Sequence, residues 1–551
     1  MGDVNEPAPP LARGAEYRGG RAASNTLVFG LGQLIVLVIA LLTTPITINH
    51  LGLALTGAWT IATMSIAYLT VIDPGFADIV TRYGARAQVR GESHVAARIC
   101  SLGSLFWLGF GVILAPVVYL VTPVLVHHVS GIGPGARSSV IDFFYWTFLL
   151  LIFGSLLATL SGRLTALGEN WIVTIIDVST RVVYCVVLIV LLYRGWKLGA
   201  IVVATSAQYA LAYLATIVVV SAKDSWPYRS PRHLDRHLLR ELYRFGGWLQ
   251  FNSLLDTLTN DTDPLILGIA VNASTSGLWS IANRLARQIT YFAYIPQSQV
   301  LPAMSASHAA EEGLDGMRRM YERAQRVVVP IGAFLAGTVI AFGPLMLKAW
   351  IGLPNRLMLL RHEVHSLNVA VFLVALTMMV GLPRPVTGNA IMAMGRVGLG
   401  VRAQTLAFCV NAVLTLALVV PYGLTGVLIG TLAARATASG YLLIRFSKMM
   451  ESTFSRLCWP WMWPLVAVTA VAALAGHVAM THWTRALQDR WVALLALIVL
   501  GLGYTVLYAI GLRLTRFFRS DDLRWLRSVA PGRLGVVISP GVIRVLTGSR
   551  P

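Results

Sequence analysis

Charged residues are scarce in this chain of 551 residues, at 12% of the total. A soluble protein carries about a quarter, and with 56% hydrophobic residues and a mean hydropathy of +0.69 this chain would present a sticky surface to water. The composition excludes an ordinary soluble enzyme. It also excludes a disordered chain, which needs low hydrophobicity.

Cysteines are also few, and no CxxC motif or cysteine–histidine cluster occurs. All four lie in or beside apolar runs, so we expect small buried hydrophobic side chains rather than a zinc site or a disulfide framework. They are Cys100, Cys185, Cys409 and Cys458. The first 20 residues contain acidic side chains before any apolar run, which is unlike a signal peptide.

Long apolar runs, by contrast, are abundant. A membrane-spanning helix needs roughly 20 apolar residues, and by that measure the sequence predicts fourteen spans. They lie near 24–48, 55–80, 99–126, 141–162, 171–193, 198–221, 244–270, 276–303, 327–350, 367–392, 399–420, 424–446, 461–481 and 491–512. We therefore predict an all-α polytopic membrane protein.

Acidic residues are the rarer charge, with 24 Asp and Glu against 44 Lys and Arg, which leaves a formal net charge of +20. With the fourteen predicted spans, 32 of the basic residues fall on the side of the termini and 8 on the opposite side. Lys and Arg accumulate in cytoplasmic loops. We therefore expect both termini in the cytoplasm and the chain in the inner membrane, and the basic excess predicts topology rather than nucleic-acid binding.

An internal repeat occurs at an offset near 220. Gly57-Ala-Trp-Thr-Ile-Ala-Thr resembles Gly277-Leu-Trp-Ser-Ile-Ala-Asn, and upstream Pro45 matches Pro264. An even number of spans separates the copies, so both halves insert in the same orientation, as in parallel repeats with a substrate cavity between them. The predicted division is an N-terminal arm, an N-lobe of six helices, a basic linker, a C-lobe of six helices, two extra helices and a basic tail: 1–22, 23–222, 223–243, 244–447, 448–515 and 516–551.

The start of each repeat resembles one known family. Leu51-Gly-Leu-Ala-Leu-Thr-Gly-Ala-Trp, then Tyr68-Leu-Thr-Val-Ile-Asp-Pro-Gly-Phe and Arg82-Tyr, is similar to the opening of Wzx-type polysaccharide flippases. Asp263-Pro-Leu-Ile-Leu-Gly, followed by Gly277-Leu-Trp-Ser-Ile-Ala-Asn-Arg-Leu, is similar to the start of that family's second lobe. These proteins belong to the multidrug/oligosaccharidyl-lipid/polysaccharide exporter superfamily.

The resemblance implies a fold and a function. It implies two six-helix lobes that form a V and move lipid-linked oligosaccharides across the cytoplasmic membrane by alternating access. In the related lipid II flippase an Asp-Arg pair early in span eight supplies a cavity arginine, and Asn283-Arg284 stands at that place here. The change from Asp to Asn alters the local charge balance. That flippase also has cavity arginines in spans one and two, which this chain lacks, so lipid II is not the expected substrate.

Ionisable residues inside spans seven and eight are the main candidate site, because each costs about 2.5–3.5 kcal/mol at mid-bilayer. Span seven carries Asp256, Asp261 and Asp263, and Asn252, Asp256, Asn260 and Asp263 fall on one face of the helix. Span eight places four further polar residues on one face: Arg284, Arg287, Gln288 and Tyr291.

Two interpretations of these residues stay open. An antiparallel hairpin would set Asp263 level with Arg284, and Asn260 level with Arg287, as structural pairs that neutralise buried charge. Alternatively the arginines, with Gln288, Tyr291, Asn252 and Asn260, line a cavity and bind a diphosphate. Asp256, Asp261 and Asp263 would then bind or exchange a coupling Na⁺ or H⁺, with no other cofactor or metal expected.

Weaker signals lie elsewhere in the spans. Arg435 and Asn411 are lone polar residues that could line the C-lobe side of a cavity, whereas Asp73 is expected to cap a helix segment after a break in span two. Asp177 and Arg181, four residues apart, are expected to pair along one helix. Aromatic residues among the arginines of the 6–7 connection and the tail suggest contact with anionic lipids, although a simple topology anchor is the favoured interpretation.

Three function classes are compatible with a polytopic membrane protein. We favour a flippase that translocates a polyprenyl-diphosphate-linked oligosaccharide for cell-surface polysaccharide biosynthesis, possible partners being a polysaccharide polymerase or export components. A cation-coupled multidrug antiporter of the same fold is the alternative, kept open by the acidic residues within the spans. A glycan polymerase or glycosyltransferase is disfavoured, because the outer loops are short and no catalytic arrangement occurs. We therefore expect no enzyme activity.

Overall fold

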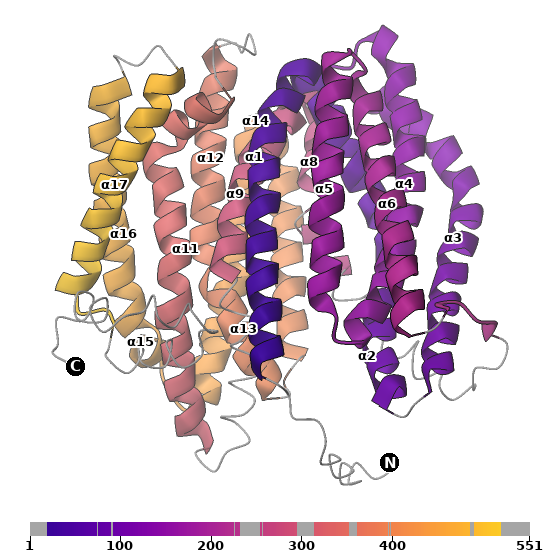
Figure 1. The fold of residues 1–551 in the computed structure, drawn as a ribbon. Helices are drawn as coiled ribbons and strands as arrows, with labels where there is room; N and C mark the ends of the chain where they lie inside the picture. The colour runs from indigo at the N-terminus through magenta and orange to yellow at the C-terminus, as the bar shows by residue number, and fades with distance from the viewer. Residues whose placement is uncertain are drawn as a thin grey trace.

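The computed structural model consists of α-helices joined by short connections (Figure 1). Statements below concern the residues that it describes, which are 19–73, 75–89, 92–224, 226–231, 254–255, 257–259, 261–294, 313–351, 361–394, 396, 398–484 and 490–518. Ten helices in these ranges are long and apolar enough to cross a membrane. The predicted all-α membrane fold is confirmed.

The N-lobe contains the first six spans. Its helices are α1 (Gly19–Ala67), the 3-10 helix η1 (Tyr68–Ile72), α2 (Phe76–Val89), α3 (Ser93–His128), α4 (Pro134–Ala166), α5 (Asn170–Tyr193) and α6 (Lys197–Lys223). The break predicted in span two lies between η1 and α2. There the Asp73 carboxylate accepts hydrogen bonds from the backbone N–H groups of Gly75, at 3.0 Å, and Phe76, at 3.2 Å.

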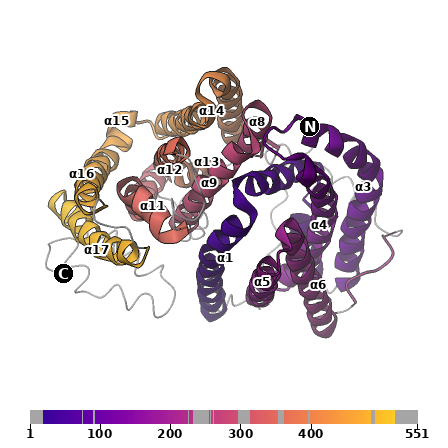
Figure 2. The same cartoon turned by 90° about the horizontal axis from the view of Figure 1, so that it is seen from above.

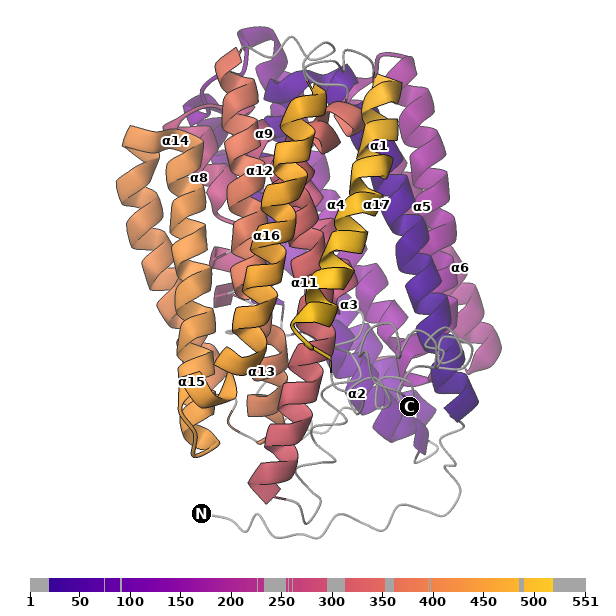
Figure 3. The same cartoon turned by 90° about the vertical axis from the view of Figure 1, so that its left-hand side faces the viewer.

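The described part of the C-lobe starts at residue 254, and two outer helices follow the lobe. The described C-lobe elements are α8 (Asp263–Ala270), α9 (Ala273–Tyr294), α11 (Gly313–Ile351), α12 (Arg361–Gly381), α13 (Pro383–Ala393) and α14 (Gly398–Met449). They are followed by α15 (Phe454–Leu457), α16 (Trp459–Thr484) and α17 (Arg490–Leu514). The last two are the extra C-terminal helices, and they pack against α11 on the outside of the bundle (Figure 3).

Two of the helices are too long to be single spans. At 1.5 Å per residue a helix of about 50 residues extends roughly 75 Å, whereas the bilayer core is about 30 Å thick. Each changes direction at a glycine with a positive φ: Gly52 (φ 75°) in α1 and Gly423 (φ 53°) in α14. A side chain is strained in this region, so glycine separates spans one and two, and spans eleven and twelve.

The lobes stand side by side. Seen from above, α2–α6 gather on one side and α11–α17 on the other, with α1 and α9 between them (Figure 2). Both helices contribute to the contact between the lobes. Apolar side chains also cover the outside, for example Val112, which is 75% exposed, and Val420, which is 84% exposed. Such an exterior suits lipid rather than water.

Candidate functional site at the junction of the lobes

The two copies of the repeated motif meet across the lobe interface. A Cβ atom on Gly57 of α1 would lie 1.7 Å from the carbonyl oxygen of Ala273, and one on Gly277 of α9 would lie 2.6 Å from that of Leu53. Only glycine therefore allows the two backbones to come this close. The nearby N–H of Ala273 also donates a hydrogen bond of 2.9 Å to the carbonyl of Ser130, in the connection between α3 and α4. These contacts close the lobes together at the end remote from the N-terminus (Figure 1).

Arg284 lies two turns further along α9 and faces the N-lobe. Its guanidinium carbon is 4.2 Å from the ring centre of Trp59, the tryptophan of the first repeat copy. Its Nε donates to the Ser280 hydroxyl at 3.3 Å, and its Nη1 approaches the hydroxyl of Thr44 in α1 at 3.5 Å. The cation–π contact holds the guanidinium over an aromatic face.

The cation of Arg284 also reaches α5. The phenol of Tyr184 interacts electrostatically with both Arg284 and Arg181. Helices α1, α5 and α9 therefore bring aromatic and cationic groups from both lobes to one place. The sequence pointed to Arg284 but not to Trp59 or Tyr184, although the position of Trp59 within the repeat was an available signal.

Asp263 opens α8 and is buried in the C-lobe, with 1% of its surface exposed. Its Oδ2 accepts a hydrogen bond of 2.7 Å from the Thr431 hydroxyl of α14. The side chains of Trp279 and Asn411 lie beside the carboxylate, but Oδ1 has no hydrogen-bond partner. An orphaned buried carboxylate oxygen is costly, and its position at a helix N-terminus offsets only part of that cost.

Asp263 does not pair with Arg284 as the hairpin geometry suggested. In the described part of the chain, Asp263 faces Thr431 within its own lobe, whereas Arg284 turns toward Trp59 and the N-lobe. The hairpin alignment placed the two residues at the same height in the membrane. It did not consider the direction in which each side chain leaves its helix. The second expected pair, Asn260 with Arg287, lies outside the residues whose side chains are described.

Asn411 ties α14 to the segment before α8. Its Nδ2 donates to the carbonyl of Thr259 at 2.9 Å, and its Oδ1 accepts a bond of 2.9 Å from the Thr415 hydroxyl. About two turns earlier in α14, the amide of Gln404 donates to the Thr259 hydroxyl at 3.1 Å and the Leu255 carbonyl at 3.2 Å. Asn411 and Asp263 thus belong to one buried polar network, which the sequence had not connected.

The remaining candidates are dispersed. Asp261 is half-buried beside Asp263, Arg435 packs its side chain over Gly381 at the end of α12, and Asp73 caps α2. The side chains of the other six candidates lie outside the described residues, so their roles stay predictions: Asn252, Asp256, Asn260, Arg287, Gln288 and Tyr291. The pairing of Asp177 with Arg181 is confirmed, with Nε 3.0 Å from Oδ2.

Comparison with known proteins decides the family. A model of the polysaccharide biosynthesis protein family matches residues 65–352, more than half of the chain. The chain belongs to this family. A comparison with curated proteins found no match.

Two solved structures share the fold of this family member. A lipid II flippase, MurJ, in an inward closed conformation superposes with a TM-score of 0.65 at 11% identity, over 88% of this chain and 98% of that one. An inward-facing multidrug resistance MATE transporter of the MOP superfamily superposes with a TM-score of 0.62 at 13% identity, over 77% and 98%. The family match confirms the resemblance to polysaccharide biosynthesis proteins, the two structures show that the chain has their fold, and the chain is a multi-pass membrane protein.

Proposed function

We propose that the protein flips a polyprenyl-diphosphate-linked oligosaccharide across the cytoplasmic membrane by alternating access, for cell-surface polysaccharide biosynthesis. The observation that carries this proposal is the position of Arg284. A guanidinium at the junction of two lobes, resting on Trp59 and half-buried, offers N–H donors suited to a diphosphate. Alternating access follows from a junction built of two repeat copies that close at one end.

The competing functions fit the same geometry less well. A cationic drug would meet the positive charge of Arg284 at the junction, which disfavours a multidrug antiporter. The family and its structural neighbours are transporters and flippases, and binding with conformational change needs no catalytic group. We therefore propose that the chain is not an enzyme and acts only by moving its substrate.

We also propose that a cation binds at Asp263 and drives the cycle. The carboxylate and the Thr431 hydroxyl place oxygen atoms side by side in a buried place, and hard cations prefer oxygen ligands. Arrival of a cation would neutralise the carboxylate and satisfy Oδ1. Because the same network joins α8, α9 and α14, occupancy can change how these helices pack.

We propose that both termini lie in the cytoplasm, because most Lys and Arg residues fall on the side of the termini. The basic linker and tail would then contact anionic lipids of the inner membrane. A polymerase or export component would receive the flipped product. No nucleic acid is involved.

Reversal of charge at Arg284 tests the proposal. Arg284→Glu should abolish surface polysaccharide in a deletion strain and cause the lipid-linked precursor to accumulate, because the diphosphate would meet a carboxylate. The measurement is extraction and mass analysis of the polyprenyl-linked glycans, together with the amount of protein in the membrane. Arg445→Glu, at an exposed arginine of α14, is the matched control and should export normally. Normal polysaccharide in Arg284→Glu cells would disprove the assignment.

A further inference from the structure

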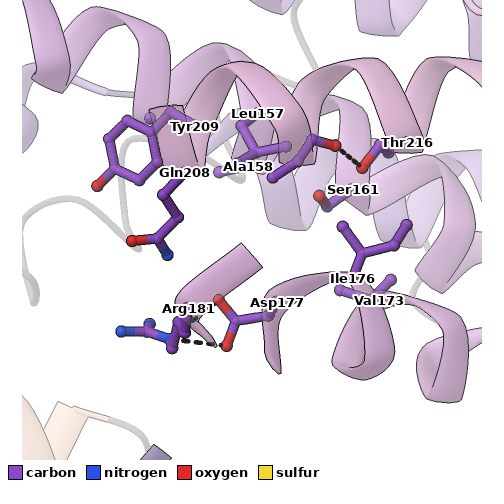
Figure 4. A pocket seen from close by; sticks show the side chains of 12 residues that line it. Leu157, Ala158, Ser161, Val173, Ile176, Asp177, Arg181, Gln208, Tyr209 and Thr216 are labelled. Atoms are coloured by element: carbon purple, nitrogen blue, oxygen red, sulfur yellow. Dashed lines mark hydrogen bonds and ion pairs between the residues drawn. The ribbon is translucent and has the colours of Figure 1, made fainter. Parts of the chain in front are cut away.

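The N-lobe contains a pocket that the proposed function has not used. It encloses about 300 Å³ between α4, α5 and α6 (Figure 4). Asp177 and Arg181 lie in the first half of α5, so the pocket lies in the half of the N-lobe that is nearer to the N-terminus of the chain (Figure 1). A cavity of this size can hold a small ligand.

Charge of both signs faces this pocket. The Asp177 and Arg181 side chains pair along α5 but stay 41% and 42% exposed, so each has hydrogen-bonding capacity left for a ligand. The pair sums to zero charge. A pocket that is polar and neutral does not suit a diphosphate, which requires a positive site.

Gln208 of α6 adds an amide to the lining of this pocket. Its side chain is 8% exposed, yet its amide makes no hydrogen bond to any described residue. In Figure 4 the amide points from α6 toward Asp177 and Arg181, across the pocket. The amide is not among the fully buried side-chain groups that lack a partner, so it is accessible from the pocket, and a bound molecule that both donates and accepts can hydrogen-bond to it.

An aromatic ring and an apolar wall complete the pocket. Tyr209 packs over Gly154 of α4, where a Cβ atom would lie 3.2 Å from the ring, and its phenol interacts electrostatically with Asp177 and Arg181. Leu157 and Ile176 line the pocket beside them. Because residue 154 is glycine and has no side chain, the Tyr209 ring can pack against α4 at the pocket wall.

We propose that this N-lobe pocket binds a neutral sugar ring of the lipid-linked substrate. Hydroxyl groups both donate and accept, which matches a carboxylate, a guanidinium and an amide set around one space. The C–H face of a pyranose suits the tyrosine ring and the apolar wall. This proposal rests on the proposed function, because the ligand is the glycan of the molecule whose diphosphate is assigned to Arg284.

The two sites are connected through Tyr184. Its phenol interacts electrostatically with Arg181 of the pocket and with Arg284 at the lobe junction. Tyr184 of α5 therefore lies near both Arg181 of the pocket and Arg284 of the lobe junction. The pocket would recognise the glycan, whereas Arg284 would recognise the lipid-linked end common to all such substrates.

Binding measurements on the full-length protein in lipid nanodiscs, free of glycoside detergents, test the pocket. The probes are the methyl glycosides of glucose, galactose and mannose, followed by saturation-transfer NMR, and undecaprenyl diphosphate without sugar. At least one glycoside should bind the wild type. Gln208→Leu should weaken that binding about tenfold, as expected for one lost hydrogen bond to a buried group, and leave undecaprenyl diphosphate binding unchanged.

Two further variants make the outcome decisive. Ala158→Phe fills the pocket but replaces no polar residue, and it should also remove glycoside binding. Leu211→Ala, on an exposed part of α6, should leave glycoside binding unchanged. Failure of all three glycosides to bind, or binding that ignores both pocket variants, would overturn the pocket. Arg284→Gln should weaken only undecaprenyl diphosphate binding. If that lipid fails to bind while glycoside binding still depends on Gln208, the pocket stands and the diphosphate assignment falls.

Discussion

The two lobes hold their intramembrane charges in opposite ways. In the N-lobe, Asp177 and Arg181 neutralise each other on one helix and remain accessible from a pocket. In the C-lobe, Asp263 is buried and bonded to Thr431, with Asp261 beside it and no cationic partner among the described residues. An ion pair with no net charge suits a neutral ligand. A buried carboxylate without a cationic partner is neutralised when a cation binds. The lobes share a repeat and differ in what they can bind.

The repeated tryptophans show the same divergence. Trp59 in the first copy receives Arg284 from the other lobe, while Trp279 in the second copy lies beside Asp263 of its own lobe. The glycines of the motif, by contrast, serve one common purpose at the interface. The glycine contacts between the lobes are therefore common to both copies of the repeat. The charged residues that surround each tryptophan differ between the copies.

The largest effect is expected where the lobes are alike. Gly57→Ala should reduce export to background, because the added methyl would lie 1.7 Å from the Ala273 carbonyl and the lobes could not close. Gly277→Ala should act in the same way and somewhat less strongly. The measurement is recovery of surface polysaccharide in a deletion strain, normalised to protein in the membrane.

A matched glycine controls for a general effect on helices. Gly440 in α14 has open space around its Cβ position, so Gly440→Ala should export normally. Normal export by both interface variants would show that transport does not need this contact, and that the shared motif is not a closing device.

A smaller and more selective effect is expected where the lobes differ. Asp263→Asn should lower transport about tenfold, equivalent to about 1.4 kcal/mol of lost coupling, and remove its dependence on the cation gradient. Transport into inverted vesicles under imposed sodium or proton gradients measures this. Asp177→Asn is the control in the other lobe and should keep the gradient dependence. If both variants kept or both lost the gradient dependence, the proposal that only the C-lobe carboxylate binds the coupling cation would be wrong.

The smallest effect concerns stability. Asp177→Asn should change the free energy of unfolding by less than about 1 kcal/mol, because both partners are well exposed. Asn411→Leu should cost about 1–3 kcal/mol, since it strands the buried Thr259 carbonyl and Thr415 hydroxyl. Unfolding titrations of the purified protein in mixed micelles can compare them. A larger loss for Asp177→Asn would mean that the pocket pair is structural.

Much of the architecture was predictable because a membrane imposes simple rules. Apolar runs must be helices, since backbone groups find no partners in lipid, and the breaks at Asp73 and between the paired spans followed from local residue types. The pair of Asp177 and Arg181 was predictable because four residues make one helical turn. The importance of Arg284 and Asp263 was visible as unexplained charge in an apolar segment.

The surroundings of those charges were not predictable in the same way. Arg284 of α9 meets Thr44 and Trp59 of α1, more than 200 residues earlier in the chain. Asp263 and Thr431 are separated by 168 residues. Helical spacing says which residues share a face but not which neighbour that face meets. Of the two interpretations left open by the sequence, the pairing of Asp263 with Arg284 is not found, for that reason.

By itself the sequence determined that this chain is a helical membrane protein of two related halves, because hydropathy, charge bias and the repeat are properties of short segments. Only the tertiary structure decided which charges are paired, which lobe holds a lone carboxylate and where a pocket opens. Those outcomes depend on how the helices rotate and cross. At the junction two glycines let α1 and α9 touch, and Arg284 of α9 meets Trp59 of α1 beside that crossing.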